Sequence, residues 1–132
     1  LLLLTDSSGL AARLMEPGTC EKEYMLRVRP PPGDGVLRKL RGGLEIHDGN
    51  LGRGRTLPCC VRVVENGGET SVLRFTIQEG RNRQLRRMCA AVGLAVEWLV
   101  RLRVGPIELG ALPLGHARDA TEEELAALMS VA

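Results

Sequence analysis

Alternation of apolar and polar residues predicts most of the strands in this chain. It is clearest at residues 21–29, where alternate residues from Tyr24 to Val28 fall on one face. The pair Asn66-Gly67 lies between two strand-like runs and favours a tight hairpin turn. The predicted strands are residues 1–4 (buried), 21–29, 45–47, 59–64, 71–78 and 95–104, with a short hairpin-forming stretch at 107–114.

Apolar residues at helical spacing predict the helices. Four of them between Leu85 and Val92 recur on one face of residues 82–92, and Gly93 ends this pattern. Thr121 and Glu124 have the spacing of a capping box at the start of the last helix. Two shorter helices are predicted, one through Met15 before Pro17-Gly18, and one from an N-cap at Asp34 to Gly42-Gly43.

Two further expectations follow from the local composition. The glycine-rich residues 48–55 are expected to form a mobile loop, because they lack apolar periodicity. In the last helix, Leu125 and Leu128 are expected to face inward.

These elements predict one α+β domain, with a mixed, largely antiparallel β-sheet and flanking helices. A length of 132 residues suits a single core, and no linker or repeat divides the chain. The longest uncharged apolar run is residues 1–4, far short of the roughly 20 residues that cross a bilayer, so a membrane span is excluded. Because the chain opens without Met inside an apolar run, we expect a domain over residues 1–132 that is truncated before Leu1.

The charge distribution indicates a polyanionic partner. The net charge is only +2, but the basic residues are 16 arginines and 2 lysines. Residues 74–103 hold seven arginines against two glutamates, whereas residues 108–132 are acidic. Arginine favours bidentate contact with phosphate or carboxylate, although an arginine-rich genome gives the same bias.

The cysteines and histidines do not form a metal site or a hydrolase triad. The four cysteines have neither metal-ligand spacing nor the arrangement of a disulfide framework, so we interpret them as reduced thiols of a cytoplasmic protein. Cys89 falls on the apolar face of a predicted helix, which favours core packing over catalysis. His47 and His116 lie in turn-like contexts without a relay partner.

Residues 79–88, EGRNRQLRRM, carry the richest chemistry, because a strand passes through glycine into an arginine-rich helix. Arg83 and Arg87 are predicted on the side away from the apolar stripe, where they can reach phosphates. The helix N-terminus beside Arg81 and Asn82 also favours an anion. Arg86, at the edge of the stripe, needs a carboxylate partner. The alternative is a solvated basic helix in which Arg86 extends its charge to water.

Tyr24 is the only tyrosine, and its strand pattern directs it inward. It is either an amphipathic core residue or an aromatic ring that packs against a flipped base.

The order of motifs resembles bacterial ribosomal-RNA pseudouridine synthases of the small-subunit (RsuA-like) type, over almost the whole chain. The matching segments are LLLLTD at residues 1–6, GLA at 9–11, EKEY at 21–24, EGRNRQLRRM at 79–88, RLRVGP at 101–106 and LG at 109–110. The resemblance implies an isomerase without cofactor or metal, which detaches uracil from its ribose, rotates it and rejoins it through carbon 5.

The resemblance also implies roles for individual residues. Arg86 corresponds to the arginine that pairs with the catalytic aspartate, and Tyr24 to the tyrosine that packs against the target base. The residues implied to hold RNA are Arg81, Asn82, Arg83, Arg87, Arg101 and Arg103.

One part of the family pattern is missing. The catalytic aspartate belongs to a Gly-Arg-Leu-Asp segment shortly before the position of Leu1, which the printed chain does not contain. Asp6 lies on the far side of the predicted strand from that place. The N-terminal RNA-binding domain of the S4 type, which often precedes this fold, is also absent from the printed residues.

Three functions therefore compete. The first is an isomerase that makes pseudouridine in ribosomal RNA and is inactive without the upstream aspartate. We expect it to be a cytoplasmic monomer with no membrane partner. The second is a non-catalytic RNA-binding module of the same fold, and an upstream aspartate decides between them. The third is a structural α+β domain, which predicts no salt-dependent RNA affinity.

Overall fold

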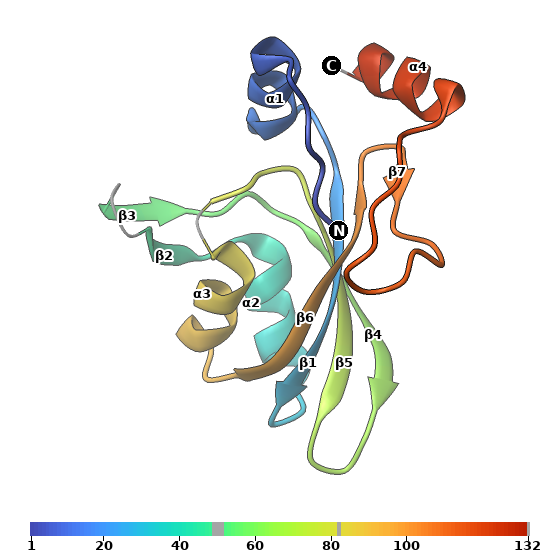
Figure 1. Ribbon diagram of the computed structural model, residues 1–132. Coiled ribbons are helices and arrows are strands. Elements are labelled where there is room, and N and C mark those ends of the chain that lie inside the picture. The colour runs from blue at the N-terminus through green and yellow to red at the C-terminus, as the bar shows by residue number, and fades with distance from the viewer. Residues whose placement is uncertain (49–51, 82, 132) are drawn as a thin grey trace.

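The chain was analysed as a computed structural model, which describes residues 1–48, 52–81 and 83–131. Its elements are α1 (Ser8–Met15), β1 (Lys22–Arg29), α2 (Asp34–Gly42), β2 (Glu45–Asp48), β3 (Gly52–Arg55), β4 (Cys60–Asn66), β5 (Ser71–Ile77), α3 (Gln84–Ala91), β6 (Ala95–Val104), β7 (Ile107–Glu108) and α4 (Glu122–Val131). Five strands form an antiparallel sheet in the order β4-β5-β1-β6-β7. Strands β2 and β3 form a separate two-stranded ribbon that extends away from the sheet (Figure 1). The α+β class with a largely antiparallel sheet is confirmed.

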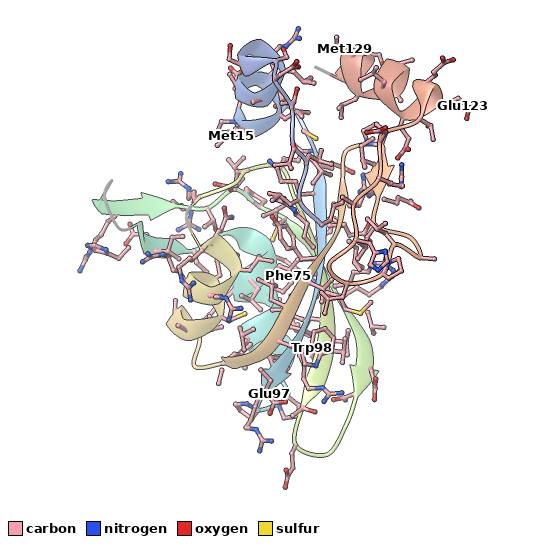
Figure 2. The ribbon with its side chains drawn as sticks, viewed as in Figure 1. Met15, Phe75, Glu97, Trp98, Glu123 and Met129 are labelled. Atoms are coloured by element: carbon pink, nitrogen blue, oxygen red, sulfur yellow. The ribbon has the colours of Figure 1, made fainter. Side chains whose placement is uncertain are left out.

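The main core lies between the sheet and the helices α2 and α3. Leu26 and Val28 of β1 are fully buried there, because the alternation of β1 turns them to the same face. Phe75 of β5 is also fully buried and lies near the centre of the molecule (Figure 2). Met88 and Cys89 of α3 close this core, so the predicted apolar stripe of α3 is confirmed.

A second, smaller core joins α1 and α4 to one end of the sheet (Figure 1). Leu10 and Leu14 of α1 pack there with Leu128 of α4, and the sheet contributes Val104 of β6 and Ile107 of β7. The capping box of α4 is confirmed, since the Thr121 N–H donates to Glu124 Oε1 at 3.0 Å and the Glu124 N–H donates to Thr121 Oγ1 at 3.1 Å. The small core places both helices at the end of the sheet where β6 pairs with β7.

The opposite face of the sheet carries ion pairs instead of a helix-covered core. Glu23 of β1 pairs with Arg74 of β5 and, at 3.0 Å, with Arg103 of β6. Arg27 lies over the ring of Trp98, 5.6 Å from its centroid, which is a cation–π geometry.

Two segments differ from their predicted structure. Residues 1–4 are not a strand, and Leu2 and Leu4 are 74% and 86% exposed because only the alternate leucines pack on the small core. Residues 52–55 form strand β3 instead of a loop, because they pair in register with β2. Asp48, the first residue of that predicted loop, is the last residue of β2, and residues 49–51 lie outside the described residues.

Three smaller corrections concern β7, α2 and α4. Of the predicted stretch 107–114, only Ile107–Glu108 is a strand. Gly33 is the N-cap of α2, and Asp34 is its first helical residue. Leu125 is 49% exposed, since α4 rests on the small core through Leu128 alone among its leucines.

Candidate active site

Tyr24 lies in the middle strand of the sheet, on the face that α2 and α3 cover. Its register partners are Phe75 of β5 and Arg101 of β6. The side chain is half-buried and packs against the main core. The predicted inward direction of Tyr24 is therefore confirmed, and its role in chemistry stays a prediction.

Lys22 lies two residues before Tyr24 on the same face and is only 6% exposed. Among the described residues, its Nζ atom has no hydrogen-bond partner. Burial lowers the pKa of Lys22, and the nearby charge of Arg101 lowers it further, against an opposing effect of Cys20. Sequence reasoning missed this residue, because an alternating strand pattern does not show that a lysine at its end is buried.

The two arginines at the end of β6 have different surroundings. Arg101 donates from Nε to the carbonyl oxygen of Leu1 at 2.9 Å, and the Leu1 amino group donates to the Arg101 carbonyl at 3.3 Å. Arg103 is instead bound by Glu21 at 3.1 Å and Glu23 at 3.0 Å. The hydrogen bond from Arg103 lowers the pKa of Glu23, and Arg74 adds to this effect.

A register shift in β6 explains this difference. Arg101 is opposite Tyr24 and Arg103 is opposite Glu23, so one extra residue of β6, Leu102, lies between two adjacent pairs. Adjacent residues of β1 point to opposite faces, and the two arginines follow them. From the sequence, Arg101 and Arg103 are both expected to hold RNA. The structure places only Arg101 on the face of Tyr24.

Glu79 and Arg81 connect the sheet to the ribbon. Glu79 is 2% exposed and accepts from the Leu57 N–H at 2.5 Å and from Arg81 Nε at 2.8 Å. Arg81 Nη2 also donates to the Arg55 carbonyl at 3.1 Å. At Gly54, an added Cβ would lie 2.6 Å from Arg81 Nη1, so a side chain there would displace the Arg81 guanidinium from its present position.

Arg83 is the N-cap residue of α3, an exposed residue in a left-handed conformation with φ of 49°. Gln84 Oε1 accepts from the Arg81 N–H at 3.1 Å, which orders the approach to the helix. Arg87 donates from Nη1 to the His47 carbonyl at 2.5 Å and so holds β2. Asn82, which the sequence placed beside the helix N-terminus, lies outside the described residues.

Arg86 is half-buried, as its place at the edge of the apolar stripe predicts. Within residues 1–48, 52–81 and 83–131, no ion pair joins Arg86 to a carboxylate. The predicted partnership with an aspartate therefore stays a prediction.

Burial keeps the thiols of Cys59 and Cys89 protonated. Burial raises the pKa of Cys89 to about 12 and that of Cys59 to about 11, so neither forms a thiolate near neutral pH. The core role of Cys89 is confirmed by its complete burial. The described part of the chain holds no group of three metal-binding side chains, and none of its helices is long and apolar enough to cross a membrane.

This architecture is that of a pseudouridylate synthase. A crystal structure of a protein with that description is 28% identical to the chain, with a TM-score of 0.80, and the match covers 94% of the chain and 52% of the solved one. The family model for RNA pseudouridylate synthases matches residues 1–91. The chain belongs to the RNA pseudouridylate synthase family, which confirms the resemblance carried by its motifs.

Two curated relatives are named for different ribosomal subunits. The ribosomal large subunit pseudouridine synthase B of Bacillus subtilis (strain 168) is 36% identical, over 100% of the chain and 53% of that protein. The ribosomal small subunit pseudouridine synthase A of Escherichia coli (strain K12) is 35% identical, over 98% of the chain and 54% of that protein. The chain thus spans about half the length of the curated relatives it matches.

Proposed function

We propose that the chain forms most of the catalytic domain of an enzyme that converts uridine to pseudouridine in ribosomal RNA. The observation that carries this proposal is the family match, which spans the segment holding both Tyr24 and Arg86. The names of the relatives support ribosomal RNA as substrate. Four free cysteines support action in the reducing cytoplasm, where we propose that the protein works as a monomer.

The reaction exchanges one bond of the nucleoside for another. The bond from ribose carbon 1′ to N1 of uracil breaks, and carbon 5 of the turned ring bonds to carbon 1′. Carbon 5 loses a proton and N1 gains one. The ring of Tyr24 offers a face against which the extruded base packs, as enzymes that act on bases require.

The nucleophile in this proposal is an aspartate of a Gly-Arg-Leu-Asp segment that precedes Leu1 in the whole protein. Arg86 would hold its carboxylate. The half-buried position of Arg86 supports this role, because a guanidinium at the margin of a core is costly without an anionic partner.

Two arginines are the best candidates for contact with the RNA backbone. Arg83 is exposed at the start of α3, and Arg101 is on the face of Tyr24. Arg81 and Arg87 would act less directly, since their hydrogen bonds to the Arg55 and His47 carbonyls hold the ribbon β2–β3 beside α3. Arg103 has two glutamates as partners and would contribute least.

The test compares the printed chain with a version extended at its N-terminus by the aspartate-bearing segment. Both are incubated with ribosomal RNA transcripts, and pseudouridine is measured by mass spectrometry of the digested nucleosides. The extended protein should form pseudouridine, and its Asp→Asn variant should not. If the extended protein binds RNA with the salt dependence of phosphate contacts but converts no uridine, the proposal gives way to a non-catalytic RNA-binding module.

A further inference from the structure

The buried ammonium group of Lys22 lies beside the tyrosine of the proposed site and has no role in the reaction proposed for Tyr24 and Arg86. Lys22 and Tyr24 are two residues apart on β1, so their side chains leave the same face about 7 Å apart. Lys22 is the more buried of the two, at 6% exposure. Its register partners are the apolar residues Ile77 and Val104.

The charged groups around Lys22 do not neutralise it. Arg101 is a second cation on the same face, and the thiol of Cys20 is buried with a pKa that burial raises. Glu21 and Glu23 belong to the ion pairs of Arg103 on the other face.

Two further groups lie at the glycine turn after β5. The carboxylate of Glu79 is occupied by Leu57 and Arg81. At Gly80, an added Cβ would come 3.6 Å from Lys22 Nζ, so this glycine leaves the ammonium in contact with the turn.

Such an ammonium is costly to bury unless it forms hydrogen bonds with a group that arrives later. Among the described residues its Nζ has no partner. The proposed function supplies one such acceptor, a group of the RNA substrate that enters the interior next to Tyr24. An RNA phosphate stays at the rim of a site, whereas an extruded base is inserted into it.

We infer that Lys22 is a further catalytic residue, whose ammonium donates a hydrogen bond to a carbonyl oxygen of the uracil ring that packs against Tyr24. This inference rests on the proposed function. When the bond between carbon 1′ and N1 breaks, its electron pair stays on the ring, and the negative charge spreads over N1 and both carbonyl oxygens. A fixed cation in a water-poor site stabilises this charge.

Lys22 is chemically unchanged at the end of the reaction. The aspartate holds carbon 1′ while the ring turns, and the electron pair of carbon 5 then forms the new bond to carbon 1′ as the aspartate leaves. The proton of carbon 5 departs and N1 takes up a proton. The same ammonium disfavours cytosine if it faces position 4, because cytosine carries a donor amino group there in place of a carbonyl.

The experiment uses the extended protein with Lys22→Met and Lys22→Arg. Lys39→Met is the matched control, since Lys39 is the only other lysine and is exposed on α2. Conversion at saturating RNA, RNA affinity at several salt concentrations and thermal unfolding are measured for each variant. The Lys22→Met protein should convert uridine about 100- to 1,000-fold more slowly, with unchanged RNA affinity. Lys22→Arg should recover part of the rate, and Lys39→Met should behave like the unsubstituted protein.

Thermal unfolding separates a catalytic role from a structural one. Replacing a buried ammonium that lacks an internal partner by methionine should leave the melting temperature unchanged or raise it. The inference is overturned if Lys22→Met keeps its conversion rate, or if the slower rate follows a lower melting temperature. It is also overturned if the RNA affinity falls and the slope of its salt dependence decreases by about one. That change indicates that Lys22 contacts a phosphate of the RNA backbone. Absence of conversion by the unsubstituted extended protein contradicts the proposed function itself.

Discussion

Glu79 should be the most important carboxylate for the stability of the fold around the site. It is almost fully buried and holds two partners, the Leu57 N–H at 2.5 Å and Arg81 Nε at 2.8 Å. Glu79→Ala removes both hydrogen bonds and leaves the Leu57 N–H without its acceptor. Glu69 offers a matched control, because it is 83% exposed and reaches Arg29 only at 3.4 Å.

The magnitude follows from these contacts. A hydrogen bond to a charged group contributes about 1.5–3 kcal/mol, and we take about 2 kcal/mol for Leu57. The Arg81 pair is discounted to about 1 kcal/mol, because that side chain is 31% exposed. Glu79→Ala should therefore lower the free energy of unfolding by about 3 kcal/mol, and Glu69→Ala by less than about 0.5 kcal/mol.

The assay is urea denaturation followed through the fluorescence of Trp98, the only tryptophan. Glu79→Gln should lower the free energy of unfolding by about 1.5 kcal/mol, between the values for the other two variants. Its amide oxygen can still accept one hydrogen bond. Equal unfolding free energies for the Glu79→Ala and Glu69→Ala proteins would show that the two hydrogen bonds of Glu79 do not stabilise the fold.

Two further predictions concern titration and reactivity. The ion pair with Arg118, together with the Thr121 N–H, holds the pKa of Glu124 at about 2. The stability that this carboxylate adds to α4 is therefore fully present above pH 4.5 and is lost as the pH falls from 4.5 through about 2. A carboxyl titration by NMR checks this, and a midpoint near 4.5 for Glu124 would contradict it. Exposed Cys60 should react first with a thiol reagent near neutral pH, whereas Cys89, whose pKa burial raises to about 12, should react only after unfolding. Mass spectrometry of the first labelled peptide checks the order, and early labelling of Cys89 would show that the core around α3 is open.

The elements with strong local signals could be predicted from sequence. The hairpin of β4 and β5 and the apolar face of α3 follow from turn chemistry and helical spacing, which depend on neighbouring residues alone. Strand β3 could not be found in this way. Its residues Gly52–Arg55 have low strand propensity, and they are ordered by pairing with β2 and by the contact of Arg81 with Gly54.

Two features of the site depend on long-range packing. The register shift that separates Arg101 from Arg103 arises from the pairing of β6 with β1 and leaves no local signal. The burial of Lys22 requires knowing which elements cover that end of the sheet. The sequence did place Tyr24 facing inward and Arg86 half-buried, because both follow from the periodicity of a single element.

We propose that Tyr24 and Arg86 belong to a site that isomerises uridine in RNA. The most direct measurement is pseudouridine formation in a ribosomal RNA transcript by the extended protein and its Arg86→Lys and Tyr24→Leu variants. Circular dichroism and RNA affinity are recorded in parallel. We expect both variants to fold and bind RNA while conversion falls at least 100-fold, since each loses a contact made at the reacting base or its nucleophile. Conversion at the unsubstituted rate by either variant would contradict the account.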